Sequence, residues 1–354
     1  MTLALGLAGL LTACGGGRTG DAAQSIGPVE NAHLHMYMNL SDFLDSSYVQ
    51  QVRERIEGAD GVEFTDNFDE LKTETGVDFR ELSGILVSAN LDGIDFMNPE
   101  PEPIRNLSGH AVFGFKSALT MEQLHAVLNL LVEDSNGELR LESGTAAGQD
   151  IRLIHFVHEP EAPQVHVALA PDGKAVVATL NAASLERALA QAGSGRTPSQ
   201  RAELTAALRS LSGKQYQAVM VFPDELREIM RAQAAEAMAM DAMTGQMMAP
   251  FQNIGAMMIS AHAGDNLDLS LKGDFGSAEA ANQAKAQLTM LKGFMTMGLQ
   301  GQGVDGLLSI AQSMEPEADG NLGGMSLTLT PEATESLAED MMQIMMMRMM
   351  GGGF

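Results

Sequence analysis

The feature that most constrains the fold is an order of predicted elements that occurs twice along the chain. Each match pairs one segment of the first half with one of the second, and both segments are predicted as a strand or as a strand that runs into a helix. The predictions rest on alternating or helically spaced apolar residues. The four pairs are residues 36–44 and 218–226, 85–90 and 257–262, 111–131 and 267–295, and 176–183 and 326–331. One such match arises easily by chance, but four in the same order favour a duplicated unit.

The repeated order predicts an α+β fold made of two tandem copies. Each copy is expected to place its helices on one face of a mainly antiparallel sheet. The first copy covers residues 30–195 and the second residues 200–354, joined by a Gly/Ser-rich linker near residues 193–198. Within the first copy, Thr120 and Gln123 form a capping-box pattern that predicts a helix start.

The charge of the chain narrows the classes of partner. The 354 residues include 46 acidic and 21 basic side chains, which gives a formal net charge of −25. Nucleic-acid binding draws its affinity from clustered Lys and Arg, so this composition argues against a nucleic-acid partner. The same charge disfavours spreading on an anionic lipid surface. Acidic excess mostly confers solubility, with a basic protein partner or weak Ca²⁺ association as the minor alternative.

The first residues have the pattern of an export signal. The apolar run Leu3–Leu11 is too short to cross a bilayer, which takes about 20 apolar residues, but it has the length of a signal-peptide core. Leu11-Thr12-Ala13-Cys14 follows, and Cys14 is the single cysteine of the chain. This arrangement resembles the lipobox of bacterial lipoproteins, although no Lys or Arg precedes the apolar run.

The resemblance implies that residues 1–13 are a signal peptide and that Cys14 is the lipidation site. It implies a membrane partner through the N-terminal lipid and a place in the cell envelope. Sorting rules for such lipoproteins associate an Asp after the cysteine with retention at the inner membrane. Because Gly15 stands there, the resemblance favours a location at the outer membrane, facing the periplasm. The glycines after Cys14 predict a flexible tether over residues 14–29.

The stretch His33–Leu40 contains two histidines and two methionines, which suggests a soft-metal site at first sight. Its alternation predicts a β-strand instead, in which the two residue types point to opposite faces. The expected core face holds Leu34, Met36, Met38 and Leu40, and the expected exposed face holds His33, His35, Tyr37 and Asn39. The strand interpretation is favoured, and a loosely held metal at the two histidines is the alternative.

Methionine is unusually frequent, with 26 residues, and concentrates near residues 238–248 and 341–350. Thioethers bind Cu(I), but neither segment has a His or Cys close by in sequence. Helices that pack on the sheet or face a partner are therefore favoured. The alternatives are a Cu(I) site and an apolar groove that accepts acyl chains or a protein.

Other patterns do not indicate catalysis or a cofactor. His155 and His158 lack zinc-protease spacing, and the acidic loop of Asp92, Asp95, Glu100 and Glu102 lacks the spacing of a Ca²⁺ loop. The sequence holds neither a phosphate-binding Gly-Lys-Ser/Thr loop nor a Gly-x-Ser-x-Gly elbow. No catalytic residue, metal ligand or cofactor is predicted.

The sequence thus predicts a non-enzymatic, lipid-anchored protein of the bacterial envelope with a binding or structural role. The alternatives are a periplasmic carrier of apolar ligands and a Cu(I)-binding protein that uses its Met-rich helices. A carboxylate-based hydrolase comes last among the interpretations. The predicted partners are a membrane and, at the Met-rich surface, a protein or an apolar ligand.

Overall fold

The computed structural model describes residues 22–60, 66–94, 96, 107–146, 148–159, 161–194, 198–240, 252, 254–300, 304–338 and 340. These residues form two compact units. The first takes its described residues from the ranges Met1–Asp45 and Glu63–Pro223, and the second from Ser46–Val62 and Asp224–Phe354. Each unit combines helices with an antiparallel sheet, so the α+β class is as predicted.

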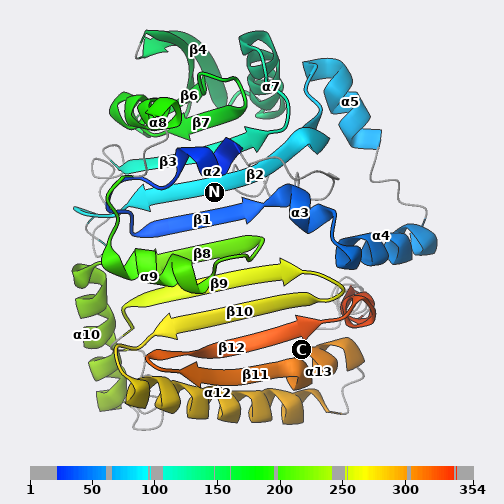
Figure 1. The fold of residues 1–354 in the computed structure, drawn as a ribbon, viewed down its shortest axis with the longest axis vertical. Helices are drawn as coiled ribbons and strands as arrows, with labels where there is room; N and C mark the ends of the chain where they lie inside the picture. Colours follow the sequence, from blue (N-terminus) through cyan, green and yellow to red (C-terminus); the bar gives the residue numbers. More distant parts are fainter. Residues whose placement is uncertain are drawn as a thin grey trace. The chain divides into compact units, whose positions relative to one another are not determined.

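The first unit contains an eight-stranded sheet in the order β8-β1-β2-β3-β7-β6-β5-β4, with antiparallel neighbours (Figure 1). Its strands are β1 (Leu34–Asn39), β2 (Leu82–Asn90), β3 (Ser108–Phe115), β4 (Leu139–Ala146), β5 (Gln149–Phe156), β6 (Val165–Leu169), β7 (Ala175–Thr179) and β8 (Tyr216–Val221). Its helices are α2 (Ala22–Ile26), α3 (Leu40–Leu44), α5 (Asp66–Thr75), the 3₁₀ turn η1 (Phe79–Glu81), α7 (Met121–Asp134), α8 (Ala182–Ser194) and α9 (Ala202–Ser210).

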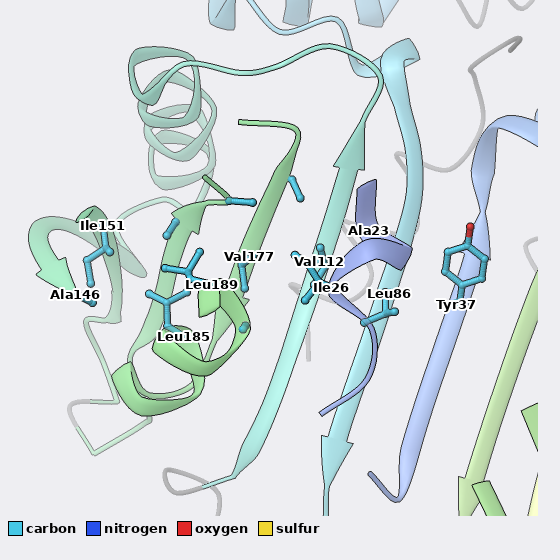
Figure 2. Packing of buried hydrophobic residues seen from close by; sticks show 14 residues of the cluster. Ala23, Ile26, Tyr37, Leu86, Val112, Ala146, Ile151, Val177, Leu185 and Leu189 are labelled. Carbon is cyan, nitrogen blue, oxygen red and sulfur yellow. The ribbon is translucent and has the colours of Figure 1, made fainter. Parts of the chain in front are cut away.

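Helices cover both faces of this sheet, which corrects the prediction that they lie on one face. Leu185 of α8 and Ile26 of α2 pack on the face that presents Val177 and Val112 (Figure 2). Leu124 and Leu128 of α7 form a separate buried cluster; the strand residues in it are Leu139, Ile154 and Val167. Strands such as β5 bury apolar residues of both parities, here Ile151 and Ile154, and therefore need a cover on each side.

The second unit contains a four-stranded antiparallel sheet in the order β11-β12-β10-β9. Its strands are β9 (Ala256–Ala263), β10 (Leu267–Asp274), β11 (Met314–Asp319) and β12 (Leu322–Leu329), and its helices are α4 (Ser47–Asp60), α10 (Asp224–Met240), α12 (Ala278–Leu299) and α13 (Asp305–Ser313), followed by helical residues 331–338. Helix α12 lies along β11 and β12 (Figure 1). A Cβ at Gly323 would lie 2.9 Å from the Ala281 carbonyl oxygen, so glycine permits this close approach of helix and strand.

Helix α4 belongs to the second unit although its sequence lies within the predicted first copy. Arg55 forms ion pairs with Glu332 and with Glu335, the latter at 2.8 Å. The Tyr48 hydroxyl lies 2.5 Å from the Thr334 hydroxyl, and burial raises the pKa of Tyr48. The compact units therefore divide the chain differently from the predicted ranges 30–195 and 200–354, because residues 46–62 pack with the C-terminal part.

The predicted tether over residues 14–29 extends too far, since the described residues from Ala22 onward are folded. Ala23 and Ile26 of α2 are fully buried in the core of the first unit (Figure 2). The Gln191 side chain on α8 donates hydrogen bonds to the Ile26 and Pro28 carbonyl oxygens, at 2.8 and 3.0 Å. Residues 22–29 are thus part of the domain, and the stretch 14–21 lies outside the described residues.

Replacing Gly306 by Ala is expected to destabilise the second unit by about 2 kcal/mol, as overpacking does. An added Cβ would lie 2.6 Å from both the Leu337 nitrogen and the Ser336 carbonyl carbon, which are rigid backbone atoms. Gly298→Ala on α12 is the matched control, because nothing lies within 4 Å of the position that its added methyl group would take, and Ala favours a helix. Urea denaturation compares the two variants; equal transition midpoints would contradict the close contact at Gly306.

Candidate functional site

The strand predicted over the His33–Leu40 stretch is present as β1, but its buried face is opposite to the expected one. His33, His35 and Tyr37 are buried, whereas Leu34 and Met36 are only partly buried. The alternation was predicted correctly and its orientation was wrong. The physical reason is that α2 packs over the histidine face, where Tyr37 and Ile26 share one apolar cluster.

His33 serves to hold the start of β1 against the loop that follows β2. His33 Nδ1 lies 3.1 Å from the Leu91 nitrogen and 3.2 Å from Asn90 Oδ1. His33 Nε2 lies 3.6 Å from the Asp92 carboxylate, which also forms a 2.8 Å ion pair with Arg201. The imidazole is engaged on both nitrogens, so it is not placed as a free metal ligand.

His35 belongs to a polar row that crosses three strands. The register pairs His35 of β1 with Ser88 of β2, and Ser88 with His110 of β3. Directly paired residues of neighbouring strands lie on one face of a sheet, so the three side chains form a row with Ser88 in the middle. All three are buried, with exposed fractions of 6%, 1% and 4%.

The N-terminal segment after α2 covers this row and satisfies part of it. The ring nitrogen Nε2 of His110 lies 2.9 Å from the Gly27 carbonyl oxygen and donates to it. The Val29 N–H donates to the Ser88 hydroxyl at 3.1 Å, and that hydroxyl donates to the Leu34 carbonyl oxygen at 3.2 Å. Gly27 adopts a φ of +71°, a left-handed conformation that glycine accommodates readily.

A serine between two histidines could in principle be a catalytic nucleophile with a histidine as its general base. A catalytic serine needs a hydrogen bond to its base and access to substrate. The Ser88 hydroxyl instead donates to a backbone carbonyl and lies buried under residues 27–29. The row is therefore built for structure, not for acyl transfer.

Burial keeps both imidazoles neutral. Desolvation lowers the pKa of His35 from 6.5 to about 4, with a smaller contribution from the nearby His110. Desolvation also lowers the pKa of His110 to about 4, against the opposing effect of its hydrogen bond to Gly27. The row makes the stability of the first unit sensitive to acid, because protonation of either ring would place a charge in the core.

The other residues weighed as ligands are dispersed. His155 Nε2 lies 3.1 Å from the Glu142 carboxylate, and His158 is exposed beyond the end of β5. Asp92 pairs with Arg201, while Asp95, Glu100 and Glu102 lie outside the described residues. Among the residues that the structure describes, no group of three or more His, Cys, Asp or Glu side chains is arranged to hold a metal ion.

The second candidate site is an exposed apolar surface on α12. Met290, Phe294 and Met297 are 56%, 58% and 64% exposed, and we call these three residues the α12 stripe. Their spacing of four and three residues places them on one side of a helix. The opposite side packs inward through Ala281 and Ala284, which are fully buried.

The α12 stripe was not identified from the sequence, in which residues 267–295 were predicted only as a strand followed by a helix. Leu291 and Met295 lie beside the stripe and are themselves about two-fifths exposed. A helix that is apolar on all sides is normally buried on all sides. The signal that would have revealed the surface is the second apolar series at 290, 294 and 297.

Three predicted features lie outside the described residues. These are Cys14, the C-terminal Met-rich segment 341–350, and most of the segment 238–248, of which only the backbone of α10 up to Met240 is described. The Cu(I) and groove alternatives therefore stay predictions. Among the described residues, no helix is both long enough and apolar enough to span a membrane.

Comparisons with known proteins give little further guidance. No protein-family model matches the chain, and no curated protein matches it. One similar solved structure is titled "Structure of crystal form III of TP0453"; it has 10% sequence identity and a TM-score of 0.41, over 91% of this chain and 98% of that chain. A likeness this remote carries no functional conclusion.

Proposed function

We propose that the protein is a lipid-anchored protein of the bacterial cell envelope with a non-enzymatic binding role. The anchor is Cys14, the sole cysteine, which follows a signal-like apolar run. The binding role rests on one observation, the α12 stripe, since exposed clusters of large apolar residues mark interaction surfaces. The lean toward the outer membrane, facing the periplasm, rests on Gly15 after the cysteine.

The position of α2 makes the proposed anchor a short one. Seven residues separate Cys14 from Ala22, where α2 begins. Fully extended, the eight residue-to-residue steps from Cys14 to Ala22 span at most about 29 Å. An acyl group on Cys14 would hold the first unit within that distance of the bilayer surface, which suits a protein that works at a membrane.

The burial of the chemically versatile groups supports a role without catalysis. The histidines of the polar row are neutral and covered, and Ser88 is closed to substrate. Copper binding is the less favoured alternative on α12. Seven residues, or about 10 Å along the helix axis, separate Met290 from Met297, whereas thioethers that share one ion are expected at closer spacing.

A carrier of apolar ligands remains the second candidate, favoured by the same α12 stripe. A carrier and a protein-binding module both need an exposed apolar surface. They differ in what purifies with the protein. Native mass spectrometry of the full chain is expected to show the apo mass for a partner-binding protein and a lipid adduct for a carrier.

We also propose that the chain arose by duplication, as its sequence predicts. The strand order β2-β3-β7-β6 of the first unit corresponds to β9-β10-β12-β11 of the second. In the first unit, β2 and β3 are followed in the chain by α7, the hairpin β6–β7 and α8. In the second unit, β9 and β10 are followed by α12, the hairpin β11–β12 and helical residues 331–338. The additional hairpin β4–β5 accounts for the greater length of the first copy.

Metabolic labelling with a palmitate analogue tests the anchor. The wild-type chain is expected to carry the label and to sediment with membranes, and Cys14→Ala is expected to lose the label completely. Ser25→Ala is the matched control, because Ser25 is exposed and its substitution leaves the lipobox intact. Label on Cys14→Ala, or on none of the three proteins, would refute acylation at Cys14.

A further inference from the structure

Helix α12 presents more apolar surface than the described residues of its own unit cover. The helix has 22 residues and lies along β11 and β12, with α13 beside it (Figure 1). That packing buries Ala281 and Ala284 and leaves the α12 stripe in solvent. A surface of this kind on a folded unit indicates an occupant that the described residues of the chain do not supply.

The charge around the stripe differs from that of the rest of the protein. The chain carries a net charge of −25, yet no acidic residue occurs between Glu279 and Asp305. The same interval contains Lys285 and Lys292, so it is locally cationic. After Glu279 in its first turn, α12 carries only basic charges, so the sign of the charge beside the stripe is complementary to an anionic lipid surface.

Three polar side chains of α12 near the stripe already have hydrogen-bond acceptors within the protein. The Thr289 hydroxyl donates to the Lys285 carbonyl oxygen at 2.8 Å, and the Thr296 hydroxyl donates to the Lys292 carbonyl oxygen at 2.8 Å. The Lys292 ammonium donates to the Gln312 carbonyl oxygen on α13. Contact with lipid therefore leaves neither threonine hydroxyl unsatisfied, and the Lys292 ammonium keeps one acceptor within the protein.

The size of the stripe distinguishes a lipid surface from a second copy of the chain. A stable dimer needs roughly 20–30 residues on each side. The stripe has three strongly exposed residues over two turns, which is small for a dimer but sufficient for side chains that enter the headgroup region of a bilayer. Interfacial helices insert one apolar face in this way while the helix axis stays parallel to the membrane.

We propose that the α12 stripe inserts into the surface of a phospholipid bilayer that contains anionic lipid. This inference deepens the proposed binding role, on which it rests, by naming the occupant of the surface. Met290, Phe294 and Met297 enter the interface between headgroups and acyl chains. Lys285, exposed on the same helix, interacts with anionic headgroups.

Vesicle flotation of the unacylated full chain, Cys14→Ala, tests the inference. The vesicles contain phosphatidylcholine alone or phosphatidylcholine mixed with phosphatidylglycerol. Phe294→Gln is expected to reduce the partition coefficient about tenfold, as the loss of one buried aromatic side chain does. Lys285→Gln is expected to weaken binding only to the anionic vesicles and only at low salt. All variants share one N-terminus, so differences between them report α12.

Leu271→Gln is the matched control, because Leu271 is an exposed apolar residue of β10 outside the stripe. It is expected to leave vesicle binding unchanged, and circular dichroism verifies that each variant is folded. Equal binding of Phe294→Gln and Leu271→Gln would overturn the inference. A dimer seen by sedimentation and dissociated by Phe294→Gln would overturn the lipid occupant and keep α12 as a binding surface. Absence of both vesicle binding and self-association would overturn the lipid occupant and leave the proposed binding role to a protein partner or a free apolar ligand.

Discussion

Replacing Ile26 by Asp is expected to lower the free energy of unfolding of the first unit by roughly 4 kcal/mol or more. Ile26 is 1% exposed, and it packs in the cluster that includes Val112 and Leu86 of the sheet (Figure 2). The substitution removes an apolar side chain, which costs about 2–5 kcal/mol by itself. It also places an unpaired carboxylate in the core. Urea denaturation followed by circular dichroism measures the loss.

The matched control for this substitution is Gln24→Asp on the same helix. Gln24 is exposed, so the same carboxylate there stays hydrated and is expected to change stability by less than about 0.5 kcal/mol. Equal transition midpoints for the two variants would show that α2 is not part of the core. The result decides whether the folded domain begins at residue 22, eight positions after the proposed lipid attachment.

Local features of the fold were predictable from the sequence where short-range chemistry decides them. The Thr120–Gln123 capping box is confirmed: each side chain accepts a hydrogen bond from the other residue's backbone N–H, and α7 begins at the next residue, Met121. The alternation in the stretch His33–Leu40 correctly predicted a strand. Both signals lie within a few residues and need no knowledge of distant contacts.

The orientation of β1 was not predictable, because a period of two fixes which residues share a face but not which face is buried. Leu and Met are on average more buried than His, and this preference was overruled here. His110 finds its hydrogen-bond partner in the Gly27 carbonyl oxygen, and Ser88 finds one in the Val29 N–H. These partners lie 50 or more residues from the atoms they bind, so no local pattern reveals them.

The predicted domain boundaries were wrong for a similar reason. Helix α2 has only five residues, AAQSI, and is held by Gln191 from α8. Helix α4 joins the second unit through Arg55 and its two glutamates near residue 333. Composition marks residues 14–29 as tether-like and residues 46–62 as part of the first copy, whereas contacts between distant segments decide where each one packs.

The α12 stripe was not predicted from the sequence. A Met-rich surface was considered for residues 238–248 and 341–350, whose side chains lie outside the described residues, whereas the exposed apolar residues that the structure describes are on α12. The sequence shows that α12 is apolar without showing how wide the sheet beneath it is. Exposure depends on that width, since β11 and β12 cover one side of the helix, and among the described residues Met290, Phe294 and Met297 on the other side stay exposed.

Lowering the pH from 7 to 5 is expected to reduce the stability of the first unit by about 4 kcal/mol through His35 and His110. Each pKa is lowered from 6.5 to about 4 in the folded protein. The unfolded chain therefore binds protons first as the pH falls, and stability that is fully present above pH 6.5 is lost progressively down to about pH 4. One pKa unit corresponds to about 1.4 kcal/mol, so each histidine contributes about 2 kcal/mol by pH 5.

The His35→Leu variant isolates this effect. His35 Nδ1 has no hydrogen-bond partner in the described part of the chain, so an apolar replacement removes the titration without stranding a donor. The variant is expected to lose about half of the stability change between pH 7 and pH 5, measured by urea denaturation at each pH. His158→Leu, which removes an exposed histidine, is expected to retain the full change. If both variants keep the wild-type pH dependence, the row does not hold its histidines neutral. If only His35→Leu loses about half of it, burial of His35 in the covered row accounts for part of the acid sensitivity of the first unit.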